Sequence, residues 1–152
     1  MTHAAAEPTL EPYTDEEHGY RLVSPAHWSV DADADGGATF DAPDSDVGAV
    51  VFVDRDGRTA AAAATAFLDE LDADAYVTGL DVCLDENRRL TSGERGRLLE
   101  CTYRDDAGER WRLCYLFVTT DDTGYTFGID WHDGVAFAPT AAVMVDSFAV
   151  TA

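Results

Sequence analysis

Residues 97–132 read RLLECTYRDDAGERWRLCYLFVTTDDTGYTFGIDWH, and this stretch predicts two consecutive β-hairpins. The two turns, DDAG at 105–108 and DDTG at 121–124, have similar sequences. Each suits a type I turn whose glycine takes the left-handed bulge position. Because the turn type decides which residues face each other across a hairpin, these two turns predict the register of three strands.

The predicted register pairs Asp105 with Glu109 in the first hairpin and Asp121 with Tyr125 in the second. One face of the three strands is then apolar or aromatic at every position. Its cross-strand neighbours are Leu99–Tyr115–Trp131, Cys101–Leu113, Tyr103–Trp111 and Phe117–Ile129. This agreement between turn chemistry and side-chain pattern supports the register.

A two-residue turn at 107–108 is the alternative for the first hairpin. It would place Cys101 opposite Cys114, as a disulfide requires. It would also pair Tyr103 with Arg112 and so divide the apolar face. We therefore reject this turn, and the disulfide with it.

The rest of the chain predicts an α+β fold. We expect strands at 19–25, 38–42, 47–54 and 80–90, and helices at 60–71 and 139–147. Thr59 can cap the first helix, and Phe148 can anchor the second in the core. This order favours an α/β/α sandwich with a central antiparallel sheet of about six or seven strands. We expect residues 1–17 to be a flexible acidic segment and residues 18–152 to form a single domain.

The charge is strongly unbalanced. The chain contains thirty Asp and Glu, ten Arg and no Lys, so the formal net charge is −20. Such a surface repels itself at low ionic strength, whereas molar salt shortens the Debye length to about 3 Å. We therefore expect a protein of a salt-accumulating cell, with monovalent cations and water at its acidic surface. Nucleic acids and anionic membranes are excluded as partners because no basic stripe is present.

The ends and the cysteines also bear on the class of protein. The N-terminus has no basic region followed by an apolar run, and no apolar stretch is long enough to span a bilayer. The three cysteines are an odd number without CxxC spacing. We therefore expect a cytoplasmic protein with reduced thiols, no metal site and no cofactor.

Several short motifs lie along residues 18–150. They are GYRL at 19–22 leading to Pro25 and Trp28, Gly93 before the strand at 99–103, the aromatic hairpins, and Asp146-Ser147-Phe148 at the end of the last helix. In these motifs the chain resembles the PsbP family in the broad sense, which includes the nuclear-import regulator that binds the GTPase Ran. The resemblance implies an α/β/α sandwich, and a binding or assembly role rather than catalysis.

The second face of the predicted hairpins mixes polar and apolar residues. Glu100, Cys114 and His132 become cross-strand neighbours there, which is the composition of an activated thiol. However, Cys114 lies between the other two, so Glu100 cannot orient the far side of the imidazole. The same three side chains span about 9–10 Å across adjacent strands, which is too wide for one metal ion.

The remaining polar residues of this predicted face are candidates for ligand binding, namely Arg112, Thr102 and Asp130. We therefore expect a non-enzymatic binding or assembly module whose partner is a protein or a small ligand. The alternative is a small thiol-dependent enzyme or hydrolase that uses Cys114 and His132.

Two other segments have a simple interpretation. The run DADADGG at 31–37 resembles a calcium loop, but Ala42 stands where the twelfth-position glutamate belongs, so we expect a hydrated turn. The arginines cluster at 88–89 and at 95 and 97. They form ion pairs with the acidic surface or, alternatively, mark a contact point for an anion.

Overall fold

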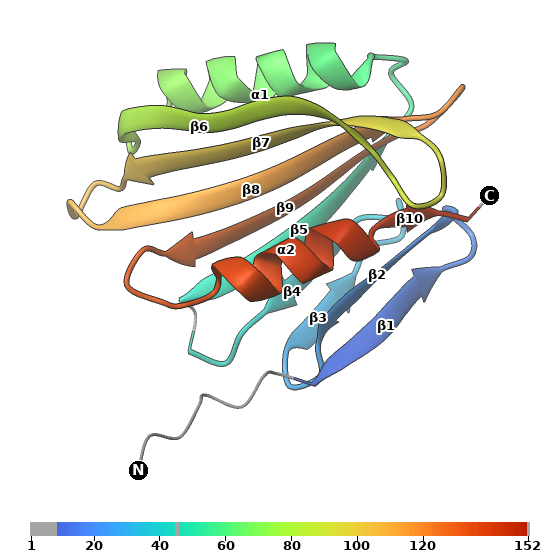
Figure 1. Ribbon diagram of the computed structural model, residues 1–152, viewed down its shortest axis with the longest axis horizontal. Helices are drawn as coiled ribbons and strands as arrows, with labels where there is room; N and C mark the ends of the chain where they lie inside the picture. The colour runs from blue at the N-terminus through green and yellow to red at the C-terminus, as the bar shows by residue number, and fades with distance from the viewer. Residues whose placement is uncertain (1–8, 45, 152) are drawn as a thin grey trace.

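The computed structural model describes residues 9–44 and 46–151, which form two antiparallel sheets and two helices (Figure 1). The strands are β1 (Leu10–Asp15), β2 (Tyr20–Pro25), β3 (Ser29–Ala32), β4 (Ala38–Asp41), β5 (Val47–Asp54), β6 (Thr78–Arg89), β7 (Arg95–Arg104), β8 (Arg110–Thr119), β9 (Gly124–His132) and β10 (Ala149–Val150). The helices are α1 (Ala60–Ala73) and α2 (Ala138–Ser147).

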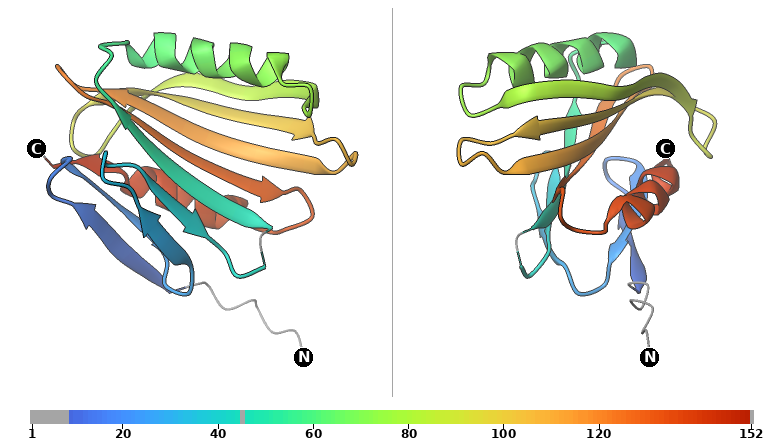
Figure 2. Two further views of the ribbon diagram at one scale, coloured as in Figure 1. Left: turned by 180° about the vertical axis from the view of Figure 1, so that it is seen from behind. Right: turned by 60° about the vertical axis from the view of Figure 1, so that its left-hand side comes forward.

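The larger sheet has seven strands in the order β3-β4-β5-β9-β8-β7-β6. Helix α1 packs on one face, and α2 lies on the other with the small sheet β1-β2-β10 (Figures 1 and 2). The predicted α/β/α sandwich is therefore confirmed. Neither helix combines the length and the apolar character that a bilayer crossing requires.

Helix α1 begins where the sequence predicts. The side chain of Thr59 accepts a hydrogen bond of 3.1 Å from the backbone N–H of Ala62, which satisfies one of the free donors of the first turn. Phe67 and Leu71 face the sheet, and the ring of Phe67 stacks on Tyr115 at 4.5 Å. This stripe of apolar side chains fixes the helix over β6, β7 and β8.

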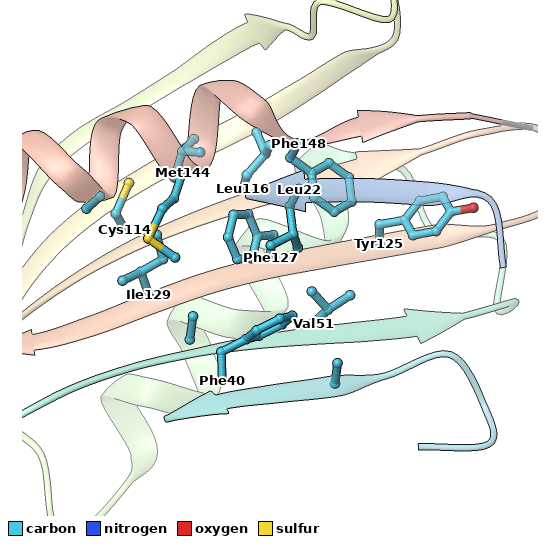
Figure 3. Packing of buried hydrophobic residues seen from close by; sticks show 14 of the residues in the cluster. Leu22, Phe40, Val51, Cys114, Leu116, Tyr125, Phe127, Ile129, Met144 and Phe148 are labelled. Carbon is cyan, nitrogen blue, oxygen red and sulfur yellow. The ribbon is translucent and has the colours of Figure 1, made fainter. Parts of the chain in front are cut away.

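The main core lies on the opposite face, between the large sheet, α2 and the small sheet. Figure 3 shows Phe148 among side chains from both sheets, and its ring stacks on Tyr20 at 5.7 Å and on Phe127 at 5.6 Å. Phe148 is 1% exposed, so its predicted role as the anchor after α2 is confirmed.

Three strands were not predicted, namely β1, β3 and β10. Strand β1 corrects the expectation of a flexible lead-in over residues 1–17, because Leu10–Asp15 pair with β2 along their whole length. The ring of Tyr13 meets Phe40 edge-on at 5.2 Å. This tertiary contact holds a segment whose own pattern shows no strand periodicity. Residues 1–8 lie outside the described residues.

The register of the first hairpin is confirmed. Gly108 has a φ of 80°, and the N–H of Asp105 donates to the carbonyl of Glu109 at 2.9 Å. Cross-strand pairs follow as predicted, with Leu99 opposite Tyr115 and the polar pair Glu100–Cys114 on the other face.

The predicted register of the second hairpin is wrong by three residues, because Gly124 pairs with Thr119 as the first residue of β9. Residues 120–123 form a four-residue loop instead. The N–H of Thr120 donates to the carbonyl of Thr123 at 2.8 Å, and the hydroxyl of Thr120 accepts from the N–H of Thr123 at 3.3 Å. The threonine side chain thus closes the loop without a left-handed glycine.

A shift by an odd number of residues moves every side chain of β9 to the other face of the sheet. Ile129 and Trp131 therefore leave the predicted apolar face and enter the main core, where they are 0% and 4% exposed. Tyr115 faces Gly128 rather than Trp131, and Phe117 faces Thr126 rather than Ile129.

Candidate functional site

The predicted catalytic group does not assemble. Cys114 lies opposite Glu100 as expected, but its neighbour on β9 is Ile129, while His132 faces Trp111 on the other side of the sheet. Cys114 is 4% exposed and belongs to the buried cluster beneath α2 (Figure 3). Burial, together with the charge of Glu100, raises the pKa of the thiol to about 12. The thiol is thus protonated at neutral pH and is not activated. Because it is buried, it is not accessible either.

His132 serves the end of the first hairpin. Its Nε2 contacts the carboxylate of Glu109, and its Nδ1 accepts a hydrogen bond of 3.2 Å from the N–H of Gly134. The ring meets Trp111 edge-on at 5.5 Å. These contacts hold the β7–β8 turn against the end of β9, which is a structural role.

The three candidates for ligand binding lie on opposite faces of the sheet. Thr102 and Arg112 pair on the α2 side, where Thr102 is 3% exposed and Arg112 lies 3.6 Å from Asp133. Arg112 and Glu100 line a small cavity of about 90 Å³ together with Trp131. Its volume holds about three water molecules. Asp130 points to the α1 side, because the three-residue shift of register moves it to the other face of β9. The prediction that Arg112, Thr102 and Asp130 share one face is therefore wrong.

Asp130 is part of a polar group that the sequence analysis does not predict. The hydroxyl of Tyr103 donates to Oδ2 of Asp130 at 3.2 Å. Burial raises the pKa of Asp130, and hydrogen bonds from Tyr115 and Tyr103 oppose that rise. Burial and the charge of Asp130 also raise the pKa of both phenols, so they remain donors at every physiological pH.

A glycine makes this arrangement possible. The ring of Tyr115 crosses β9 directly over Gly128, where an added Cβ would lie 2.3 Å from Cζ of the ring. Gly48, the residue opposite Asp130 on β5, also lacks a side chain on this face. A glycine within a strand signals close approach of another group. Gly128 was the signal in the sequence that could have located this site.

Beyond this group, part of the α1 side of the sheet is uncovered. Helix α1 lies over β6, β7 and β8, and among the described elements no helix lies over β4 and β5 on this side (Figure 2). We call this surface the open face, and it comprises Thr39, Asp41, Val50, Phe52, Asp54, Thr126 and Asp130. Phe52, which faces Thr126 of β9, is 57% exposed.

Replacement of Asp130 by Asn is expected to stabilise the folded protein at neutral pH. Folding raises the pKa of Asp130, so the protonated carboxyl favours the folded state and the ionised carboxylate does not. The stability that protonated Asp130 contributes is lost as the pH rises from the usual aspartate range through the raised pKa. Asparagine has nearly the same shape, accepts the hydroxyl of Tyr103 and carries no charge.

The measurement is urea unfolding of both proteins from pH 3 to pH 8. We expect the advantage of Asp130→Asn to grow with pH and to vanish at the acid end. Asp121→Asn, in the exposed β8–β9 loop, corrects for the loss of one surface charge. An equal increase in the free energy of unfolding for the two variants would show that burial of the Asp130 carboxylate does not destabilise the protein.

The comparisons with known proteins concern the fold. No family model matches this sequence, and no curated protein matches it either. The solution structure of cyanobacterial PsbP (CyanoP) from Synechocystis sp. PCC 6803 superimposes with a TM-score of 0.69, over 99% of this chain and 97% of that chain. The fold is PsbP-like. The sequence identity is 16%, so this similarity extends to the fold alone.

Two further solved structures share the PsbP-like fold at a TM-score of 0.57. One is PA94 from Pseudomonas aeruginosa, a protein of unknown function, which is 15% identical and matches over 91% of this chain and 94% of that chain. The other is a protein from Bacteroides thetaiotaomicron VPI-5482, which is 12% identical over 93% of this chain. The match covers 48% of that longer protein.

Proposed function

We propose that this PsbP-like domain is a non-enzymatic binding module of the cytoplasm of a salt-accumulating cell, and that it holds a protein partner on the open face. The observation that carries the proposal is the exposed ring of Phe52 on the same face as the Asp130 group. Aromatic side chains that stay exposed in a folded monomer are concentrated in binding surfaces.

The charges on the open face favour a partner with basic groups. Asp41, Asp54 and Asp130 occupy this side of β4, β5 and β9, and these three strands contain no arginine. An extended or helical segment with an apolar side chain for Phe52 and flanking Lys or Arg residues complements this pattern. Val50, half-buried beside Phe52, extends the apolar centre.

Thiol chemistry at Cys114 and His132 is the weaker alternative. It requires the two side chains to meet, whereas they lie on opposite faces of the sheet. Asp130 supports the binding role further, since a buried carboxyl that costs stability is typical of a functional position.

The proposal is tested by selecting peptides from a random library displayed on phage, against the full chain in molar KCl. We expect the selected peptides to carry an apolar residue flanked by Lys or Arg, and Phe52→Asp to weaken their binding at least tenfold. Val30→Asp is the matched control, because Val30 is 45% exposed in the same sheet but belongs to the opposite face.

Peptides that bind the wild type and Phe52→Asp equally would place the binding surface elsewhere. Failure to select any peptide above the background of an unrelated acidic protein would contradict the proposal itself.

A further inference from the structure

Strand β6 is an edge strand of the large sheet, and among the described strands none lies beyond it (Figure 1). Its register shifts against β7 fall between Thr78 and Leu84, whereas every residue from Leu84 to Arg89 faces one residue of β7. The exposed residues of this regular half are Asp85, Glu86, Asn87 and Arg89. Bulges and charged side chains both protect a sheet edge from pairing with another chain. Here the bulges protect only the first half, so the charges decide whether the second half can pair.

The charges of the second half are complementary to themselves. Residues 84–90 read LDENRRL, with two acidic residues before Asn87 and two basic residues after it. A second copy of this segment, antiparallel and centred on Asn87, places its Arg89 opposite Asp85 and its Arg88 opposite Glu86. Opposite charges in directly facing positions stabilise a pair of antiparallel strands. The same charges that prevent other pairings therefore favour this one.

The backbone of β6 supports the same arrangement. The N–H of Leu90 donates to the carbonyl of Glu94 at 2.8 Å, so these two residues are a hydrogen-bonded pair at the β6–β7 turn. Bonded and non-bonded pairs alternate along an antiparallel ladder. The N–H and C=O groups of Asp85, Asn87 and Arg89 therefore point away from β7, towards the free edge. An added strand must pair these three residues with one another, and the arrangement centred on Asn87 does so.

Other centres of symmetry within residues 85–89 are unfavourable. A pairing centred on Asp85, Glu86, Arg88 or Arg89 places that charged residue opposite its own copy. Like charges directly opposite each other destabilise a strand pair. Asn87 is the one uncharged residue of this segment, and its amide can both donate and accept a hydrogen bond across the symmetry axis.

Two of the four arginines of the β6–β7 hairpin have partners in their own chain. Arg88 lies 2.9 Å from Asp146, and Arg97 lies 2.6 Å from Asp85, so the predicted ion pairs are confirmed for these two. Arg88 also lies 3.2 Å from Glu86. A carboxylate has two oxygens and accepts several hydrogen bonds, so Asp85 and Glu86 can each accept a further arginine.

Arg89 has no carboxylate within ion-pair distance among residues 9–44 and 46–151. It faces Arg95 of β7, and like charges in this position destabilise a hairpin. In the paired arrangement, Asp85 of the second copy lies opposite Arg89 and on the same face of the sheet. The second copy thus offers the carboxylate that would offset the repulsion between Arg89 and Arg95.

We propose that residues 85–89 of β6 are a dimer interface whose occupant is a second copy of this chain. The two copies pair antiparallel about Asn87 and join their seven-stranded sheets into one continuous sheet. The symmetry axis is perpendicular to this sheet, so the α1 sides of both copies face the same way and the dimer presents two open faces on one side. The paired segment is short, and short interfaces are typical of dimers that dissociate on dilution.

This inference does not rest on the proposed function. Phe52 lies on β5, and β9, β8 and β7 separate that strand from β6. Phe52→Asp is therefore expected to leave dimerisation unchanged. Variants of β6 are expected to leave peptide binding by the dilute monomer unchanged, so the two proposals succeed or fail separately.

The experiment is sedimentation equilibrium of the full chain in molar KCl, at concentrations up to about 1 mM, where weak pairing is detected. We expect the wild type to show a monomer–dimer equilibrium. Asp85→Arg with Glu86→Arg makes the segment basic throughout, and Arg88→Glu with Arg89→Glu makes it acidic throughout. Each double variant alone is expected to dimerise at least tenfold more weakly than the wild type. An equimolar mixture of the two is expected to form a heterodimer, because every facing pair is again of opposite charge.

Two further variants control for net charge and for folding. Asp106→Arg with Asp121→Arg changes the net charge by as much as the basic variant does, but at exposed turns outside β6, and should dimerise as the wild type does. Asn87→Pro removes an N–H that points to the second copy and none that bonds to β7, so we expect it to weaken dimerisation at least tenfold and to remain folded.

Several outcomes would overturn the proposal. They are a wild type that stays monomeric at every concentration, dimerisation of the folded double variants equal to that of the wild type, and a mixture of the folded double variants that stays monomeric. Melting curves show whether each variant is folded. If a double variant does not fold, Asn87→Pro decides: undiminished dimerisation of this variant would place the interface elsewhere.

Discussion

Gly128→Ala is expected to destabilise the folded protein by about 2–3 kcal/mol, although alanine normally suits a strand better than glycine. The new Cβ would lie 2.3 Å from Cζ of Tyr115. The ring cannot rise away from β9, because Phe67 of α1 stacks on its other side at 4.5 Å. Either α1 must move or Tyr115 must leave its rotamer and lose contact with Asp130. Denaturant unfolding at equilibrium measures the loss.

Gly48→Ala is the matched control for this variant. Gly48 also lies on the α1 side of a central strand, but an added Cβ there has no neighbour closer than 3.7 Å. Its φ is not left-handed. We expect Gly48→Ala to be neutral or to stabilise the protein by about 0.5 kcal/mol, because it restricts the unfolded chain.

A double-mutant cycle identifies the ring as the cause. In a Tyr115→Ala background, Gly128→Ala should be close to neutral, since the group that it displaces is absent. An undiminished loss in that background would mean that the backbone at Gly128, and not the ring of Tyr115, requires glycine.

Transfer from molar KCl to low ionic strength is expected to lower the melting temperature by on the order of 10 °C or more. The formal charge of −20 is distributed over a small domain, and dilution restores repulsion that molar salt screens. Electrostatic repulsion of this kind is clear at the C-terminal end of α1. Its last turn contains acidic residues and no basic one, which is unfavourable beside the negative end of the helix dipole.

A variant with three neutralised carboxylates separates screening from the general stabilising action of salt. Asp69→Asn, Glu70→Gln and Asp72→Asn together remove three exposed carboxylates of α1 that make no side-chain hydrogen bond within the described residues. We expect this variant to melt higher than the wild type at low salt and to depend less on KCl. Equal melting temperatures of the wild type in molar KCl and at low ionic strength would refute salt adaptation of the surface.

The candidate site shows where sequence reasoning succeeds and where it stops. The pairing of Glu100 with Cys114 follows from a local turn, and the structure confirms it. The contact of Cys114 with His132 depends on the second turn, where the Thr120 hydroxyl closes a longer loop. The wrong turn type in the second hairpin therefore accounts both for the predicted catalytic group, which does not form, and for the prediction of Asp130 on the opposite face.

The sequence alone determined the features that depend on neighbouring residues. Thr59 caps α1, Gly108 sets the first hairpin, and the composition sets the charge of the surface. These follow from local backbone geometry and from counting ionised groups.

The tertiary structure decided which side chains meet. The Tyr103–Asp130 contact joins two strands that are not adjacent in the sheet, and β1 becomes a strand through its pairing with β2 and the packing of Tyr13 on Phe40. Both depend on parity, because side chains alternate between faces and an odd shift in pairing exchanges the two faces. Local sequence specifies each turn only approximately, whereas burial of one complete apolar face selects a single register.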